Sequence, residues 1–176
     1  MLKLTTEDRL IRRAKSGDRT AFGELVQRHQ NRILNLAYDF LGDFDQAKDA
    51  AQEIFMKAFN RIDTFEGRSS FPTWLNRIAV NTCLDIQRNR KRIPIHEQLS
   101  NQTADQGSPS QVAEIRDLLE TVFKNLSENQ KTALILKYFH GNTVPEISEI
   151  MEITENTVRI HIYRAIHKLR QKLREE

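Results

Sequence analysis

The sequence predicts an all-α fold made of two helical domains. Apolar residues recur every three or four positions along most of the chain, and no stretch shows the convincing alternation of a β-strand. Only six glycines and four prolines occur in 176 residues, which favours helices over a turn-rich β fold. A polar stretch without apolar periodicity, residues 93–111, reads as a flexible linker between the two domains. We therefore expect domains at residues 1–92 and 112–176.

Four helices are expected before the linker. The apolar spacing places them at about residues 7–15, 19–41, 46–61 and 72–92. Thr5 or Thr6 is positioned to cap the first helix with its hydroxyl. Pro72 lies in the first turn of the fourth helix, where its missing N–H costs nothing because no intrahelical acceptor exists there.

Four further helices are expected after the linker, at about residues 112–125, 128–139, 144–151 and 155–174. Ser127 and Thr143 are candidate caps, and Thr143 with Glu146 has the spacing of a capping box. The short third helix is joined to the fourth by a three-residue turn, Glu-Ile-Thr. That arrangement is typical of a helix-turn-helix.

Composition predicts a soluble, cytoplasmic protein. No apolar run approaches the roughly 20 residues that span a bilayer, and the N-terminus lacks the apolar segment of a signal peptide. We therefore expect no membrane insertion. A single cysteine, Cys83, cannot form an internal disulfide and fits a reducing compartment.

Positive charge is concentrated in particular segments, although the net charge is only +3. Residues 1–93 carry 17 Lys and Arg against 12 Asp and Glu, a net of +5. Residues 159–174 hold six basic residues and no acid. This distribution suggests that part of the surface meets a polyanion.

The last helix is the first candidate DNA-binding surface. In a helix-turn-helix the second helix enters the major groove with its N-terminal end, where short polar side chains and Arg contact base edges. Its first turns are expected to expose such residues, and Thr154 is the natural cap: Asn156, Thr157, Arg159, His161 and Arg164. A plain amphipathic helix with a solvated basic face is the alternative. A zinc site is not expected, because His161 and His167 are six positions apart and lie on different faces.

The helix at 72–92 is the second candidate surface. Trp74 precedes a polar stripe at helical spacing that consists of Arg77, Asn81, Arg88 and Arg92. An aromatic ring with Asn and Arg suits single-stranded nucleic acid, because bases stack on the ring and phosphates meet the charges. A solvated basic helix is the alternative. Asp85 is expected to pair with Arg88 rather than to act as a catalytic acid.

The outer face of the helix at 46–61 is the third candidate surface. It carries Asp49, Gln52, Glu53 and Met56 at three/four spacing. An acidic stripe would repel DNA, so we interpret it as a docking face for a protein, with Met56 as an adaptable apolar contact. A solvated acidic face is the alternative.

Two blocks of the sequence resemble the bacterial sigma factors of the sigma-70 superfamily, in the extracytoplasmic-function (ECF) group. The first block, residues 49–92, contains DAAQEIF and FPTWLNRIAVN followed by an Asp and an Arg-rich tail, similar to region 2 of that family. The second, residues 126–170, has a helix-turn-helix with T-V, a following R-A and a basic helix, similar to region 4. The linker falls where the family has its own.

The resemblance implies a role for each surface. The residues at 49, 52, 53 and 56 match the face that docks on the largest subunit of core RNA polymerase. The helix from Trp74 matches the one that opens the promoter −10 element, and the loop at 63–71 matches the loop that captures a flipped base. The start of the last helix matches the −35 reader, where Asn156 replaces the usual Gly and His161 replaces a frequent Arg. The family also implies an anti-sigma factor as a partner. From the residue patterns we expect no enzyme activity, cofactor or metal.

Two other functional classes remain as alternatives from the residues themselves. A stand-alone helix-turn-helix regulator would have a similar C-terminal half, but the acidic stripe and the Trp74 helix favour a polymerase partner. An enzyme acting on nucleic acid would need a catalytic cluster. The five histidines form no ligand or triad pattern, and no carboxylates gather for two-metal chemistry.

Overall fold

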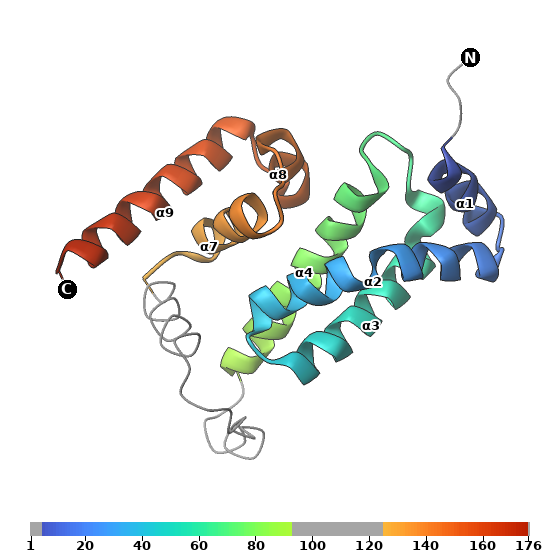
Figure 1. Ribbon diagram of the computed structural model, residues 1–176, viewed down its shortest axis with the longest axis horizontal. Coiled ribbons are helices and arrows are strands. Elements are labelled where there is room, and N and C mark those ends of the chain that lie inside the picture. The colour runs from blue at the N-terminus through green and yellow to red at the C-terminus, as the bar shows by residue number, and fades with distance from the viewer. Residues whose placement is uncertain (1–4, 93–124, 176) are drawn as a thin grey trace. The chain divides into compact units, whose positions relative to one another are not determined.

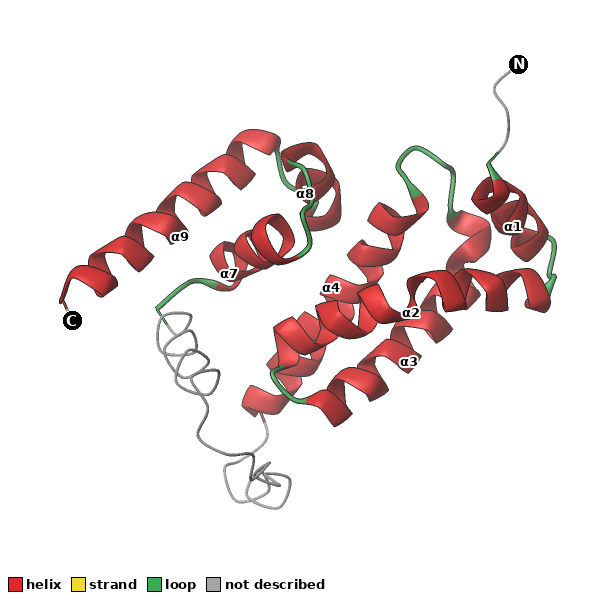
Figure 2. Ribbon diagram, viewed as in Figure 1, coloured by secondary structure: helices red, strands yellow, loops and turns green. Residues whose placement is uncertain are grey.

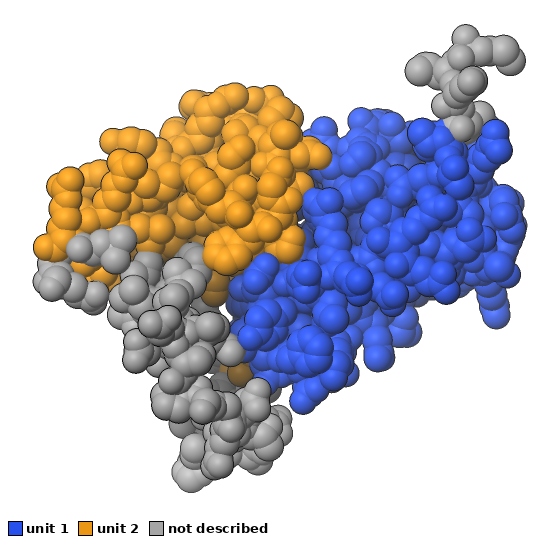
Figure 3. Space-filling view, in the orientation of Figure 1, with its two compact units in different colours: residues 1–88, 149–151 blue, residues 89–148, 152–176 orange. Residues whose placement is uncertain are grey.

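The computed structural model describes residues 5–92 and 125–175. Every regular element in these ranges is a helix, as predicted (Figure 2). The chain divides into two compact units, residues 1–88 with 149–151 and residues 89–148 with 152–176 (Figure 3). The linker at 93–111 and the helix expected at 112–125 lie outside the described residues, so the domain boundaries stay a prediction.

The N-terminal bundle contains four α-helices and one short 3₁₀ turn (Figure 1). They are α1 (Thr6–Lys15), α2 (Arg19–Leu41), α3 (Phe44–Arg61), η1 (Ile62–Thr64) and α4 (Phe71–Arg92). The long helix α2 packs on both α1 and α3. Leu25, Ile33 and Leu36 of α2, Ile54 of α3 and Leu75 of α4 are fully buried. The apolar stripes of the sequence therefore meet in one core.

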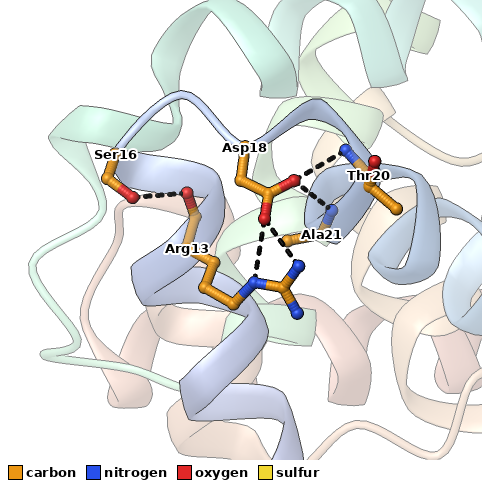
Figure 4. A network of polar contacts seen from close by, with 5 residues as sticks. All are labelled: Arg13, Ser16, Asp18, Thr20 and Ala21. Atoms are coloured by element: carbon orange, nitrogen blue, oxygen red, sulfur yellow. Dashed lines mark hydrogen bonds and ion pairs between the residues drawn. The ribbon is translucent and has the colours of Figure 1, made fainter.

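Asp18 fixes the corner between α1 and α2 (Figure 4). One carboxylate oxygen accepts from the backbone N–H groups of Thr20 and Ala21, at 3.0 and 3.1 Å, and so caps α2. The other accepts from Arg13 Nε and Nη2 at 2.8 and 2.6 Å. The bond from Ala21 and the bonds from Arg13 hold the pKa of Asp18 below its ordinary value. The corner is thus set by side-chain bonds as well as by Gly17, whose φ is +91°.

The C-terminal helices are α7 (Glu128–Leu134), η2 (Ile135–Phe139), α8 (Val144–Met151) and α9 (Glu155–Glu175). The predicted capping box of Thr143 with Glu146 is present, and Ser127 caps α7. The prediction of a single α-helix at 128–139 is partly wrong, because the last five residues of this segment form a π-helical turn. The N–H of His140 bonds to the carbonyl of Ile135 at 3.2 Å, which widens the helix just before Gly141 turns the chain.

Candidate nucleic-acid interface

A cavity of about 480 Å³ lies in the N-terminal bundle, between the end of α3, the loop at 65–70 and α4. Its size is typical of small-molecule pockets. Three of the residues predicted to meet single-stranded nucleic acid line it: Trp74, Arg77 and Asn81. So does most of the loop that precedes α4. The fold therefore brings the predicted loop and much of the predicted stripe to one concave site.

Two basic residues of α3, Lys57 and Arg61, form part of the same wall. They are four positions apart and so lie on one face of α3, and they line the cavity together with Arg77 and Asn81 of α4. Lys57 Nζ bonds to Thr82 Oγ1 at 3.2 Å, which joins the two helices at this point. Sequence reasoning missed this pair. The i,i+4 spacing of Lys57 and Arg61 can be seen in the sequence, but the sequence does not show which helix packs against that face of α3.

Phe65, Trp74 and Ile78 form the apolar part of the cavity, and Phe71 packs behind the first two. Phe65 and Phe71 are buried and meet edge to face, with centroids 5.7 Å apart. The Trp74 ring lies 5.5 Å from each of them and is only half-buried. A base can stack on such an aromatic surface while cations around the rim meet its phosphates.

Arg88, a further residue of the predicted α4 stripe, does not line this cavity. Arg88 Nη1 lies 3.6 Å from Asp85 Oδ1, as expected from the sequence. Both side chains are more than half exposed, so the pair adds little to stability. The side chain of Arg92 lies outside the described part of the structure. Trp74, Arg77 and Asn81 are therefore gathered at the cavity, and Arg88 is not.

The helix-turn-helix is formed by α8, the turn at 152–154 and α9. Glu152 has a φ of +54°, and the N–H of Ile153 returns to the carbonyl of Ser148 at 3.2 Å. Thr154 Oγ1 accepts from the N–H of Thr157 at 3.2 Å, the capping bond expected from the sequence. The side-chain cap and the tight turn together fix where α9 begins.

The candidate base-reading residues on α9 differ in exposure. Asn156, Arg159 and Arg164 are exposed, and Thr157 is half-buried. Arg159 Nη2 pairs with Glu155 Oε2 at 2.7 Å. Arg159 must leave this partner, or share it, before it can contact DNA.

His161 is half-buried, which corrects the expectation that it is exposed. It lies three positions after Val158 and four before Ala165, both fully buried, so helical geometry turns its ring towards the same side. Its Nδ1 is buried and has no hydrogen-bond partner among the described residues.

The outer face of α3 carries the predicted docking residues. Asp49, Gln52 and Glu53 are exposed, and Met56 is 67% exposed. Glu53 Oε1 pairs with Lys57 Nζ at 2.6 Å, which links this face to the cavity wall. Phe44, 52% exposed, extends the same i,i+4 row, and Lys48 Nζ lies 4.5 Å above its ring. Sequence reasoning missed Phe44 because it precedes the helix start expected at residue 46.

Cys83 of α4 is fully buried and lies near Glu53 and Lys57 of α3. Burial, and then the nearby charge of Glu53, raise the pKa of its thiol to about 12, while Lys57 acts in the opposite direction. The thiol is therefore protonated at neutral pH and shielded from reagents. Among the described residues, no group of three His, Cys, Asp or Glu side chains gathers as metal ligands would.

One helical unit thus carries a cavity lined by Trp74 and basic side chains, and the other unit carries a helix-turn-helix, an arrangement typical of helical DNA-binding proteins. The match to family models is more specific. Residues 25–93 match Sigma-70 region 2, and residues 116–169 match Sigma-70, region 4.

Curated relatives match over nearly their whole length. The RNA polymerase sigma-H factor of Pseudomonas aeruginosa is 35% identical, over 94% of this chain and 92% of its own. The ECF RNA polymerase sigma-E factor of Haemophilus influenzae is 34% identical over 98% of both chains. The factor SigW of Bacillus subtilis is 33% identical over 94% and 95%.

Solved structures agree on the fold. CnrH, solved in complex with the cytosolic domain of CnrY, has a TM-score of 0.72 at 24% identity, covering 95% of this chain and 96% of its own. The sigma factor RpoE of Bartonella quintana, solved with the anti-sigma factor NepR, has a TM-score of 0.66 at 24% identity, covering 87% and 96%.

This chain belongs to the ECF sigma factors of the sigma-70 superfamily. It is a transcription initiation factor that binds core RNA polymerase and directs it to specific promoters. None of the described helices is both long enough and apolar enough to cross a bilayer.

Proposed function

We propose that this sigma factor divides promoter recognition between its two helical regions and acts in the cytoplasm, where core polymerase works. Residues 1–92 dock on polymerase and melt the −10 element, and residues 112–176 hold the −35 element. The linker at 93–111 spans the two. The observation that carries this proposal is the cavity lined by Trp74, Arg77 and Asn81.

At the −10 element, a flipped base of the non-template strand would enter the cavity and stack on the Trp74 cluster. Asn81 is exposed at the wall and offers both a donor and an acceptor to the edge of the base. Lys57, Arg61 and Arg77 supply positive charge for the neighbouring phosphates. Capture of the base offsets the few kcal/mol that unstacking costs. Arg88 and Arg92 would contact the strand or duplex further along α4.

The test of this site uses Asn81→Ala, because loss of Trp74 would also disturb the core. Permanganate reactivity of the −10 bubble should fall in the variant holoenzyme, while binding to −35 duplex is retained. Unchanged permanganate reactivity would remove Asn81 from the site.

The exposed row Asp49, Gln52, Glu53 and Met56 is proposed as the polymerase-docking face. Reversing charge at Asp49 and Glu53 to Lys should abolish binding to core polymerase and leave the helical circular dichroism unchanged. Glu24→Lys, at an exposed acid of α2 outside this row, is the control for a reversed charge. A doubly reversed variant that still supports in vitro transcription would show that docking occurs elsewhere.

The start of α9 is proposed as the −35 reader, with Asn156, Thr157, Arg159, His161 and Arg164 at the contact surface. Thr157 and His161 are half-buried, so their contribution would come from one edge of each side chain. An anti-sigma factor is a proposed further partner, in line with the complex of RpoE with NepR from Bartonella quintana. Co-purification from the native host tests for such a partner.

A further inference from the structure

Helix α1 contacts the cavity-forming loop, although fifty residues separate them in the chain. Lys15 Nζ donates a hydrogen bond of 2.7 Å to the carbonyl of Phe65, in a partly buried position. Hydrogen bonds from a charged donor are shorter and stronger than neutral ones. Phe65 directly follows η1, which α1 also contacts, and it lines the cavity. The last turn of α1 thus holds the beginning of the loop.

The first turn of α1 is connected to the other end of the same loop. Glu7 Oε1 lies 2.8 Å from His29 Nε2, and the His29 side chain is only 12% exposed. The His29 ring in turn lies 5.4 Å from the ring of Phe71, the first residue of α4. Both ends of the loop are therefore linked to α1, one directly and one through α2.

Ser70 also fastens the end of the loop to α4, because its hydroxyl accepts from the N–H of Thr73 at 3.3 Å and its carbonyl from the N–H of Trp74 at 3.1 Å. Before it, Glu66, Gly67 and Arg68 are exposed, and Gly67 has a φ of +72°. The bond between Glu66 and Arg68 joins two exposed side chains and contributes little. The beginning of the loop therefore depends chiefly on how Phe65 is held. Because Trp74 packs on the rings of Phe65 and Phe71, the same contacts set the aromatic surface inside the cavity.

We infer that α1 is a positioning element for base capture, and that Lys15 is its main positioning residue. The inference rests on the base-capture function proposed for the cavity. The match to Sigma-70 region 2 begins at residue 25, so α1 lies outside the part of the chain that it covers. Lys15 would not touch the DNA. It would hold the Phe65 carbonyl, and through Phe65 the Trp74 ring, in the geometry that accepts a base.

The test compares Lys15→Met with Arg12→Met in the full-length protein. Arg12 is an exposed base in the same turn of α1, so both variants lose one positive charge there. The probe is the single-stranded non-template −10 strand of a promoter selected by run-off transcription from a genomic library. Trp74 is the only tryptophan of the sequence, so its fluorescence reports both the cavity and strand binding.

Lys15→Met should raise the Kd for this strand by roughly fivefold, which corresponds to the net contribution of one typical hydrogen bond. It should also shift the emission of Trp74. Lys15→Arg should restore both readouts, and Arg12→Met should change neither. Binding to core polymerase and to −35 duplex should stay at the wild-type level in all three variants.

Three results would overturn the inference: unchanged Kd and emission in Lys15→Met, an equal loss in Arg12→Met, or no rescue by Lys15→Arg. If Lys15→Met also lowers the urea midpoint, the loss of binding could come from lower stability. Glu7→Gln, at the other link between α1 and the loop, then tests the positioning role. About twofold weaker strand binding at an unchanged midpoint supports the positioning role, and unchanged binding contradicts it. Asn81→Ala distinguishes a failure of the positioning role of α1 from a failure of the base-capture function proposed for the cavity. If that variant also binds the strand normally, the base-capture function itself fails.

Discussion

The cavity of the N-terminal bundle and the start of α9 present DNA-binding groups in opposite ways. The cavity collects Lys57 and Arg61 from α3, Phe65 from the loop, and Trp74 and Asn81 from α4. The α9 surface comes from successive turns of one helix, with Arg159 and Arg164 exposed. The aromatic residues of the concave site also belong to the protein core, whereas Arg159 and Arg164 project from their helix. Substitution of a buried aromatic residue should therefore affect stability, and substitution of an exposed Arg of α9 should affect only binding.

The largest expected effect comes from Phe65→Ala. Phe65 is 8% exposed and contacts both Phe71 and Trp74, so truncation leaves a void in the aromatic cluster. The N-terminal bundle should lose about 3 kcal/mol of unfolding free energy, measured by urea denaturation with Trp74 fluorescence. Arg164→Ala, on the exposed face of α9, should leave this transition unchanged. A stability loss below about 1 kcal/mol for Phe65→Ala would break the contrast between the two sites.

The second effect is a dependence of the free energy of unfolding on pH. It is confined to the N-terminal bundle, which holds the only cysteine of the sequence. Folding raises the pKa of Cys83 from 9.0 to about 12. Between these two pH values the thiol is protonated in the folded protein and ionised in the unfolded chain. Its contribution is fully present below pH 9 and is lost as the pH rises towards 12. The slope is about 1.4 kcal/mol per pH unit.

The measurement compares wild type with Cys83→Ala between pH 9.0 and about pH 10.5. Over this range the wild-type protein should lose about 1.6 kcal/mol more than the variant, because the unfolded thiol is only half ionised at pH 9.0. The thiol should also react with a disulfide reagent far more slowly in the folded protein than in urea. Equal rates in the two conditions would mean that the α3–α4 contact opens readily.

A smaller effect is expected for Arg164→Ala in duplex binding. Loss of an exposed Arg from a base-reading surface should weaken −35 binding by about 1–2 kcal/mol, with no change in binding of the −10 strand. Electrophoretic mobility shift at fixed salt measures the first, and Trp74 fluorescence measures the second. An equal loss on both probes would show that Arg164 provides only general electrostatic attraction.

The smallest effect is expected for Glu155→Gln and has the opposite sign. Glu155 holds Arg159 at 2.7 Å in an exposed pair, so removing the charge of Glu155 frees Arg159 for DNA. Affinity for −35 duplex should rise by about 0.5 kcal/mol. The gain should disappear in the double variant Glu155→Gln with Arg159→Ala, which serves as the matched control. A gain that persists there would come from general charge alone.

The sequence by itself determined the helices, most of their ends and the residues on their outer faces. Helix capping and amphipathic spacing act between residues three or four positions apart, so the Thr143–Glu146 box, the cap at Thr154 and the place of Pro72 could be read from the chain. The two sigma-like blocks could be recognised for the same reason, because each is continuous.

Only the tertiary structure decided which faces meet. Lys57 and Arg61 became part of the cavity wall because α3 packs beside α4, and Lys15 reached Phe65 because α1 lies on η1. The partial burial of His161 and the π-helical turn at 135–139 also depend on packing and chain direction. Local sequence patterns specify the surface of each helix, but the free energy that joins two helices comes from residues far apart in the chain. That is why the cap at Thr154 and the exposure of Arg159 and Arg164 followed from the sequence, while the burial of His161 and the α3 wall of the cavity did not.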